Sequence, residues 1–303
     1  VVSATHAIAA DEGDVFIAGG VESMTRAPHV MLKTSRPWDR SPPPIADSTV
    51  GWRFVNPRMP EQWTISLGET AERVGQLYGI TREEQDAFAL ESQRRAEAAA
   101  AGGEFDAELV PVELPGPAGT ISVCRDEAPR SGLTLASLKR LEPAFLPNGT
   151  VTAGTSSGIN DGAAALSVVS AGAMNRFGLR PMARVVASAV AGVDPSCMGL
   201  GPVPATRKAL ARAGLTIEQI DLIELNEAFA VQAIACIREL RLDPARVNIY
   251  GGAIALGHPL GASGARILTT LVHALQRTGG RYGLATMCIG VGQGIALIVE
   301  SAS

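Results

Sequence analysis

The second half of the chain alternates between apolar strand-like runs and helical segments, and this rhythm limits the possible folds most strongly. A helix is expected over 204–213, because Gly214 follows it directly and glycine commonly ends helices. Strands are expected over 184–191, 221–225, 281–286 and 295–300. Strands interleaved with helices predict an α/β fold.

The first half starts in the same way and then changes character. The end of a helix precedes a strand expected over 14–18, but across 25–150 proline, tryptophan and charged residues become more frequent. One helix is clear in this stretch. Thr81 and Glu84 have the spacing of a capping box, and the helix should run from there to Gly102.

The composition excludes several classes of protein. A net charge of −4 argues against a general nucleic-acid footprint. The 4 cysteines lack paired spacing, which favours a reducing cytoplasm over a disulfide framework. No uninterrupted apolar run reaches the ~18–20 residues that a membrane span needs. We therefore expect a soluble, cytoplasmic protein with neither a nucleic acid nor a membrane as partner.

One histidine lies in the most informative segment, GGAIALGHPLGASGARI at 251–267. His258 sits between Gly257 and Pro259, where a tight loop leads into a helix. A histidine held on such a turn is a candidate general base near neutral pH. The alternative is a histidine that serves only the structure of the turn.

A cysteine follows in a second glycine-rich connection, MCIGVGQG at 287–294. Cys288 is expected where one closing strand ends and the chain turns into the next. Exposed backbone N–H groups in such a turn can bind an oxyanion, and a cysteine beside them is a candidate for nucleophilic or acid–base chemistry. Taken alone, Cys288 could equally be a small buried apolar residue.

An asparagine marks a third candidate position. Asn226 lies where the strand at 221–225 gives way to a helix, and ligands meet α/β sheets at such switch points. The structural alternative is that Asn226 caps this helix, which is probable in any event and does not exclude a role in a site.

Together these segments resemble the signature motifs of the thiolase family, and the resemblance follows the whole chain in order. The motifs are NEAFA at 226–230, GGAIALGHPLGASGAR at 251–266, CIGVGQG at 288–294, AGGVESMTRAP at 18–28 and TAGTSSGINDGAAAL at 152–166. The resemblance implies an α/β thiolase-like fold with α-β-α-β-α layers. It also implies a domain division, which is a remnant of an N-terminal domain over 1–24, an inserted loop domain over 25–150, a return to the N-terminal domain over 151–175 and a C-terminal domain over 176–303.

The resemblance also implies roles for individual residues. Cys288 would protonate the acetyl-CoA enolate, and His258 would accept the proton from the nucleophile or from CoA. Asn226 would hold a water at an oxyanion site, and the backbone N–H of Gly290 would serve a second oxyanion hole. No metal and no cofactor are implied, since coenzyme A is a substrate.

Binding of CoA would fall to the TAGTSSGIN segment, where Ser157 with Ala153 nearby would lie along the pantetheine. Met198 resembles a residue that lines the acyl end of the site, although an ordinary core methionine is an equal alternative. The implied partners are CoA and acyl-CoA. A full-length enzyme would be a homodimer or homotetramer.

One departure from the family pattern concerns the nucleophile. Thiolases carry a reactive cysteine in a CGSGLQAV-like segment, and the chain begins with VVSATHAIAA, which resembles the residues just after it. We therefore expect an N-terminally truncated chain that lacks much of the N-terminal half, with the nucleophile just before Val1 and no activity alone. The other cysteines, Cys124, Cys197 and Cys236, are outside any such motif.

Three functions follow as alternatives. The first is a degradative thiolase that cleaves 3-oxoacyl-CoA to acetyl-CoA and a shortened acyl-CoA, with 3-oxoadipyl-CoA from aromatic-compound breakdown as the candidate substrate. The second is a β-ketoacyl synthase-type condensing enzyme, which Asn226 disfavours because those enzymes carry a histidine there. The third is a non-catalytic thiolase-like protein that binds acyl-CoA or lipid.

Overall fold

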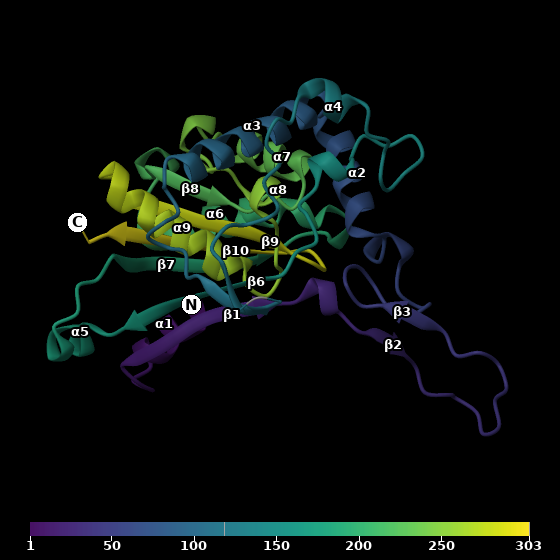
Figure 1. Cartoon of the computed structure of the whole chain (residues 1–303), viewed down its shortest axis with the longest axis horizontal. Coiled ribbons are helices and arrows are strands. Elements are labelled where there is room, and N and C mark those ends of the chain that lie inside the picture. Colours follow the sequence, from purple (N-terminus) through teal and green to yellow (C-terminus); the bar gives the residue numbers. More distant parts are fainter. Residues whose placement is uncertain (118, 303) are drawn as a thin grey trace.

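A four-stranded sheet forms the centre of the molecule. The computed structural model describes residues 1–117 and 119–302 (Figure 1). The strands β7 (Ala183–Gly192), β10 (Gln293–Ser301), β9 (Tyr282–Ile289) and β8 (Leu222–Leu225) lie in that order. The strand β10 runs antiparallel to both β7 and β9, whereas β8 runs parallel to β9.

Helices cover both faces of this sheet and bury most of β8, β9 and β10, whereas the edge strand β7 is only partly buried. On one face, α6 (Pro202–Ala213) and α7 (Ala230–Leu240) pack over a cluster that includes Leu284 and Ile298. On the other face, α9 (Ser263–Thr278) packs over Ala285 and Leu297. Because successive strand residues point to opposite faces, alternate residues of β9 and β10 enter the two clusters.

A second, smaller sheet lies on the far side of α9. It pairs β1 (Val15–Glu22) with β6 (Gly162–Val169) in antiparallel register, and both strands contact α9. The start of α1 (Val2–Ala9) packs against the α9 cluster as well. A Cβ at Gly20 would lie 1.8 Å from the carbonyl oxygen of Gly261, so only glycine permits this approach of β1 to the loop before α9. The layers are therefore the β1–β6 sheet, the helix α9, the central sheet, and the helices α6 and α7. The expected layered α/β class is confirmed.

The stretch between β1 and β6 runs out from this core and then folds back over it (Figure 1). Two short strands, β2 (His29–Met31) and β3 (Ile45–Asp47), form an arm that extends away from the core. The helices α2 (Leu67–Tyr78) and α3 (Arg82–Ala101) return to pack on α7. The remaining elements are β4 (Val112–Gly116), β5 (Gly119–Val123), α4 (Leu135–Lys139), α5 (Ala171–Phe177) and α8 (Ala253–Leu256). Short 3-10 helices lie at Met24–Arg26, Glu61–Trp63, Ala153–Thr155, Pro195–Leu200, Ile217–Gln219 and Pro244–Arg246.

The predicted elements occur with small shifts at their ends, apart from one cap. The capping box of α3 is confirmed, since Thr81 N–H donates to the Glu84 carboxylate at 2.8 Å and Glu84 N–H donates to the Thr81 hydroxyl at 3.3 Å. The prediction that Asn226 caps the following helix is wrong. That helix, α7, begins only at Ala230 with Phe229 at its N-cap position and no side-chain cap. Within the described part of the chain, no helix is both long and apolar enough to cross a membrane.

Candidate active site

The three predicted site segments converge at one end of the central sheet. Asn226 directly follows β8, and its backbone N–H donates to the Thr286 carbonyl oxygen of β9 at 3.0 Å. Cys288 lies two residues after Thr286 in β9, and β9 at this point extends beyond the end of β8. His258 comes from the loop between α8 and α9, and its ring lies 3.3 Å from the Asn226 side chain. Segments far apart in the sequence thus form one cluster.

Three contacts fix the position of His258, which is only 9% exposed. Its Nε2 lies 3.3 Å from Asn226 Nδ2, and its Nδ1 lies 2.6 Å from the Ser263 hydroxyl. Its backbone N–H donates to Asn160 Oδ1 at 2.8 Å. Both ring nitrogens therefore have a defined neighbour, and the ring has little freedom to rotate.

The surroundings keep His258 uncharged at neutral pH. Burial of the ring, and secondarily the positive charge of Arg266, lower the pKa of His258 to about 4. A neutral imidazole has one ring nitrogen with a free lone pair, so it can accept a proton. His258 is therefore in the protonation state that a general base requires.

Cys288 has the opposite character, since it retains its proton. The side chain is 5% exposed within an apolar cluster that includes Met198, Ala228 and Phe229. Burial raises the pKa of Cys288 to about 12, because a thiolate would lose its solvation there. The residue is thus a protonated thiol at neutral pH, which suits a proton donor better than a resting nucleophile.

The amide of Asn226 has one polar atom left to offer. Its Oδ1 is buried and has no hydrogen-bond partner among the described residues. Buried polar atoms nearly always find a partner, either in the protein or in an ordered water. This oxygen can accept a hydrogen bond from a water or from a hydroxyl of a bound molecule beside His258.

The segment predicted to meet CoA reaches the same cluster. Ser157 N–H donates to the Ala228 carbonyl oxygen at 3.0 Å, and Ser156 forms a bridge with Phe229. Met198 is 4% exposed and packs with Phe229 and Cys288. Ser157 therefore contacts Ala228 and Met198 packs with Phe229, which lie two and three residues after Asn226.

The other two predicted residues lie at the margins. Ala153 is exposed, in the short helix Ala153–Thr155. Gly290 lies in the turn after β9, where its carbonyl oxygen accepts from Gln293 Nε2 at 3.4 Å. Their roles toward CoA and an oxyanion stay predictions. No cluster of three or more potential metal-ligating side chains occurs among residues 1–117 and 119–302.

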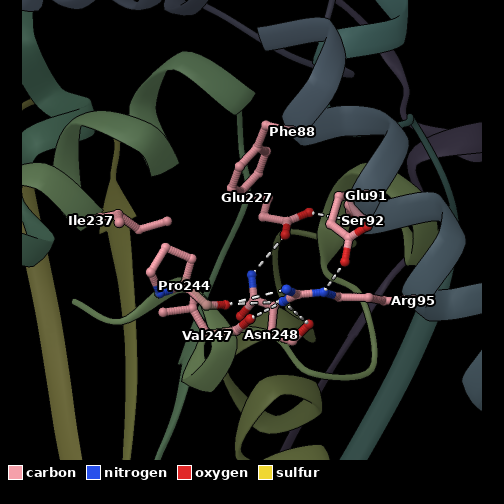
Figure 2. Close-up of a pocket in the computed structure, with 9 residues that line it drawn as sticks. All are labelled: Phe88, Glu91, Ser92, Arg95, Glu227, Ile237, Pro244, Val247 and Asn248. Carbon is pink, nitrogen blue, oxygen red and sulfur yellow. Dashed lines mark hydrogen bonds and ion pairs between the residues drawn. The ribbon is translucent and has the colours of Figure 1, made fainter. Parts of the chain in front are cut away.

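Sequence reasoning missed a buried carboxyl group behind the site. Glu227 is 1% exposed and accepts from the Ser92 hydroxyl at 2.7 Å, Asn248 Nδ2 at 2.8 Å and Ile254 N–H at 3.2 Å. It lines a small cavity of about 70 Å³. Figure 2 shows its carboxylate facing Ser92 of α3 and Asn248. A Cβ at Gly252 would lie 2.2 Å from its carboxyl carbon, so the loop leading to His258 packs directly on this group.

Glu227 therefore connects its own segment with α3 and with residues 248–254, behind the contact between His258 and Asn226. Burial raises its pKa, and the three hydrogen bonds oppose that shift. The signal in the sequence was a glutamate directly after Asn226 among apolar residues. Ser263 and Asn160, which hold the ring and the backbone of His258, were also missed; each is a small polar residue inside a quoted motif.

Comparison with known proteins assigns the family. The family model for the thiolase N-terminal domain matches residues 1–172, and that for the thiolase C-terminal domain matches residues 179–301. The chain therefore belongs to the thiolase family, which is a family of acyltransferases.

Relatives of known name agree with this assignment. The beta-ketoadipyl-CoA thiolase of Pseudomonas aeruginosa is 54% identical over 98% of this chain and 75% of its own length. The 3-oxoadipyl-CoA/3-oxo-5,6-dehydrosuberyl-CoA thiolase of Escherichia coli K12 is likewise 54% identical, with 98% and 75% covered. Human mitochondrial 3-ketoacyl-CoA thiolase in complex with CoA has a TM-score of 0.92 at 42% identity, covering 100% of this chain and 74% of that one. These matches do not bear out the expected N-terminal truncation, which stays a prediction, as does the division into four segments.

Proposed function

We propose that this site carries out the acid–base chemistry of a thiolase reaction on a 3-oxoacyl-CoA. The observation that carries the proposal is the contact between neutral His258 and Asn226, with the protonated thiol of Cys288 on the neighbouring strand. The proposed reaction would use His258 as proton acceptor, Cys288 as proton donor and the free amide oxygen of Asn226 as acceptor for a water. Acyl transfer through an enolate needs each of them.

The reaction breaks the bond between the 3-oxo carbonyl carbon, C3, and the α-carbon, C2, which lies between the two carbonyl groups. A thiolate attacks the 3-oxo carbon, the C2–C3 bond breaks, and the electron pair stays on the acetyl-CoA fragment as an enolate. Cys288 gives its proton to C2 of that enolate. A second CoA then takes the acyl group from the sulfur, and His258 accepts the proton that this CoA thiol releases. Asn226 Oδ1 holds a water whose hydrogen faces the developing oxyanion.

The substrate that we assign is 3-oxoadipyl-CoA. Two relatives that are 54% identical carry names that specify beta-ketoadipyl-CoA or 3-oxoadipyl-CoA. A CoA complex of a structural neighbour supports CoA itself as the common ligand. In this chain Ser157 and Ala153 would line the pantetheine, Met198 the acyl end, and Gly290 N–H the second oxyanion hole.

None of the four cysteines in this chain is both exposed and located at the site. Cys124 is exposed, but it directly follows β5, in the stretch between β1 and β6. Cys236 is fully buried in α7, and burial raises its pKa. Cys197 is half-buried beside Met198, and Cys288 holds its proton. We therefore expect no thiolysis of acetoacetyl-CoA or 3-oxoadipyl-CoA by this 303-residue chain alone.

The proposal includes a cytoplasmic location and a homodimer or homotetramer. All four cysteines are free, which fits a reducing compartment. Size-exclusion chromatography with light scattering decides the oligomeric state directly.

The proposed chemistry can be tested without thiolysis, by following the transfer of deuterium from D₂O into the methyl group of acetyl-CoA. These hydrogens should exchange faster in the presence of the purified chain than in buffer alone. Cys288→Ser should slow the exchange by about 10²-fold or more, since a hydroxyl is a far weaker acid than a thiol. Cys124→Ser is the matched control and should exchange at the wild-type rate.

Equal exchange by Cys288→Ser and the wild type would contradict the assigned proton donor. Binding of acetyl-CoA without any exchange would favour the non-catalytic alternative, a protein that holds acyl-CoA. Thiolysis by the unaltered chain would show that one of its own cysteines serves as the nucleophile.

A further inference from the structure

Ser263 contacts the side of the His258 ring that faces away from Asn226. The Ser263 hydroxyl lies 2.6 Å from His258 Nδ1, and neither side chain has more than 9% of its surface exposed. Water therefore does not compete freely for this contact. The proton between the two atoms can belong to the hydroxyl or to the ring, and the neighbouring groups decide which.

The hydroxyl proton is already used elsewhere. Ser263 Oγ donates to the carbonyl oxygen of Pro259 at 2.9 Å, and a serine hydroxyl has only one hydrogen to donate. Ser263 Oγ must then present a lone pair to His258, so Nδ1 carries the ring proton. In a neutral imidazole this leaves Nε2 as the acceptor.

The position of Ser263 in the fold holds this arrangement in place. Ser263 is the first residue of α9, and its backbone N–H donates to the same Pro259 carbonyl oxygen at 2.8 Å. The serine is 0% exposed, so its side chain has no solvent-facing rotamer to occupy. On the opposite side of the ring, Asn226 Nδ2 lies 3.3 Å from Nε2, which suits an N–H facing a lone pair.

We propose that Ser263 is a positioning residue that fixes His258 as its Nδ1–H tautomer and so directs the basic lone pair of Nε2 toward Asn226 and the substrate. When Nε2 accepts a proton, the Nδ1–H bond to Ser263, which itself donates to Pro259, stabilises the resulting cation. The tautomer requires no reaction for its assignment, whereas its role in catalysis rests on the proposed function.

The tautomer can be measured directly in the chain as it is. Long-range ¹H–¹⁵N correlation spectra of ¹⁵N-histidine-labelled protein at pH 7 separate protonated from unprotonated ring nitrogens. His258→Gln identifies the signals of His258 among those of the 4 histidines. The wild type should show a protonated Nδ1 and an unprotonated Nε2. Ser263→Ala should show exchange between both tautomers.

Two controls separate the contact from a general effect on the fold. Ser170→Ala removes a comparable serine from the start of α5, where it accepts from Ala173 N–H, and should leave the His258 signals unchanged. Ser263→Thr retains the hydroxyl and should retain the tautomer. If the added methyl group prevents folding, the wild-type spectrum still decides the tautomer.

A protonated Nε2 in the wild type would overturn the inference, and so would an unchanged tautomer in a folded Ser263→Ala. If the wild type exchanges no deuterium, the proposed function fails, and the spectra alone decide the tautomer.

Discussion

The two sheets on either side of α9 are built from similar apolar sequences but differ in what covers them. In the central sheet, helices lie on both faces, and Ile298 of β10 is 0% exposed. In the β1–β6 pair, α9 covers one face only, and Ile17 of β1 is 82% exposed. Apolar residues in a strand thus predict the strand, but burial depends on which elements pack against each face.

The largest effect of this difference should appear when the same substitution is made in each sheet. Ile298→Ala leaves a cavity between β10 and the helices α6 and α7, and should lower the free energy of unfolding by about 2–5 kcal/mol. Ile17→Ala removes contacts mainly with solvent and should cost less than about 1 kcal/mol. Urea denaturation of both variants gives the two values. Equal losses would mean that the outer face of β1 is covered in solution.

A smaller effect should come from a carboxyl group buried in the central sheet. Glu224 of β8 is 3% exposed, and burial raises its pKa to about 8, with Arg266 opposing the shift. In the unfolded chain this group ionises near pH ~4.5, so between these values the folded state holds one proton more. Its contribution to stability is therefore complete below the unfolded pKa and is lost as the pH rises toward about 8.

Glu224→Gln should remove that dependence, because an amide does not ionise. The free energy of unfolding of the wild type should fall with pH more steeply than that of the variant, by at most about 1.4 kcal/mol per pH unit. Glu113→Gln in the exposed strand β4 is the control, and should leave the slope as in the wild type. A steep slope that persists in Glu224→Gln would assign the titration to another buried carboxyl group.

The elements that could be predicted from the sequence are those with strong local signals. The strands of the central sheet and the start of α3 follow from local signals, namely apolar runs and the Thr81 to Glu84 capping box. The helix α2 was missed although Ser66 and Glu69 form a similar box, because it is short and Gly68 and Gly75 interrupt its helical pattern. A capping box was therefore sufficient where a long run of helix-forming residues follows it, as in α3, and insufficient where glycines interrupt the run.

For the site, motif resemblance pointed to His258, Asn226 and Cys288 as candidates, and the structure places these residues at one end of the sheet. It could not identify the groups that hold them. Glu227 was missed because its partners lie in two distant segments, α3 with Ser92 and residues 248–254 with Asn248 and Ile254. The cap assigned to Asn226 was wrong because residues 226–229 are not helical and α7 begins only at Ala230. Contacts of this kind depend on the tertiary fold.

The smallest expected effect concerns surface charges, which should not distinguish the two sheets. Arg184 of β7 pairs with Glu300 of β10, with the arginine side chain 67% exposed, and Arg176 lies 4.0 Å from Asp14 before β1, with side chains 61% and 52% exposed. Exposed pairs contribute about 0–1 kcal/mol because solvent screens them. Arg184→Ala and Arg176→Ala should each change the free energy of unfolding by less than about 1 kcal/mol, and 1 M salt should shrink any difference. A loss in Arg184→Ala comparable to that in Ile298→Ala would mean that charge pairing across β7 and β10, rather than burial by helices on both faces, makes the central sheet the more stable one.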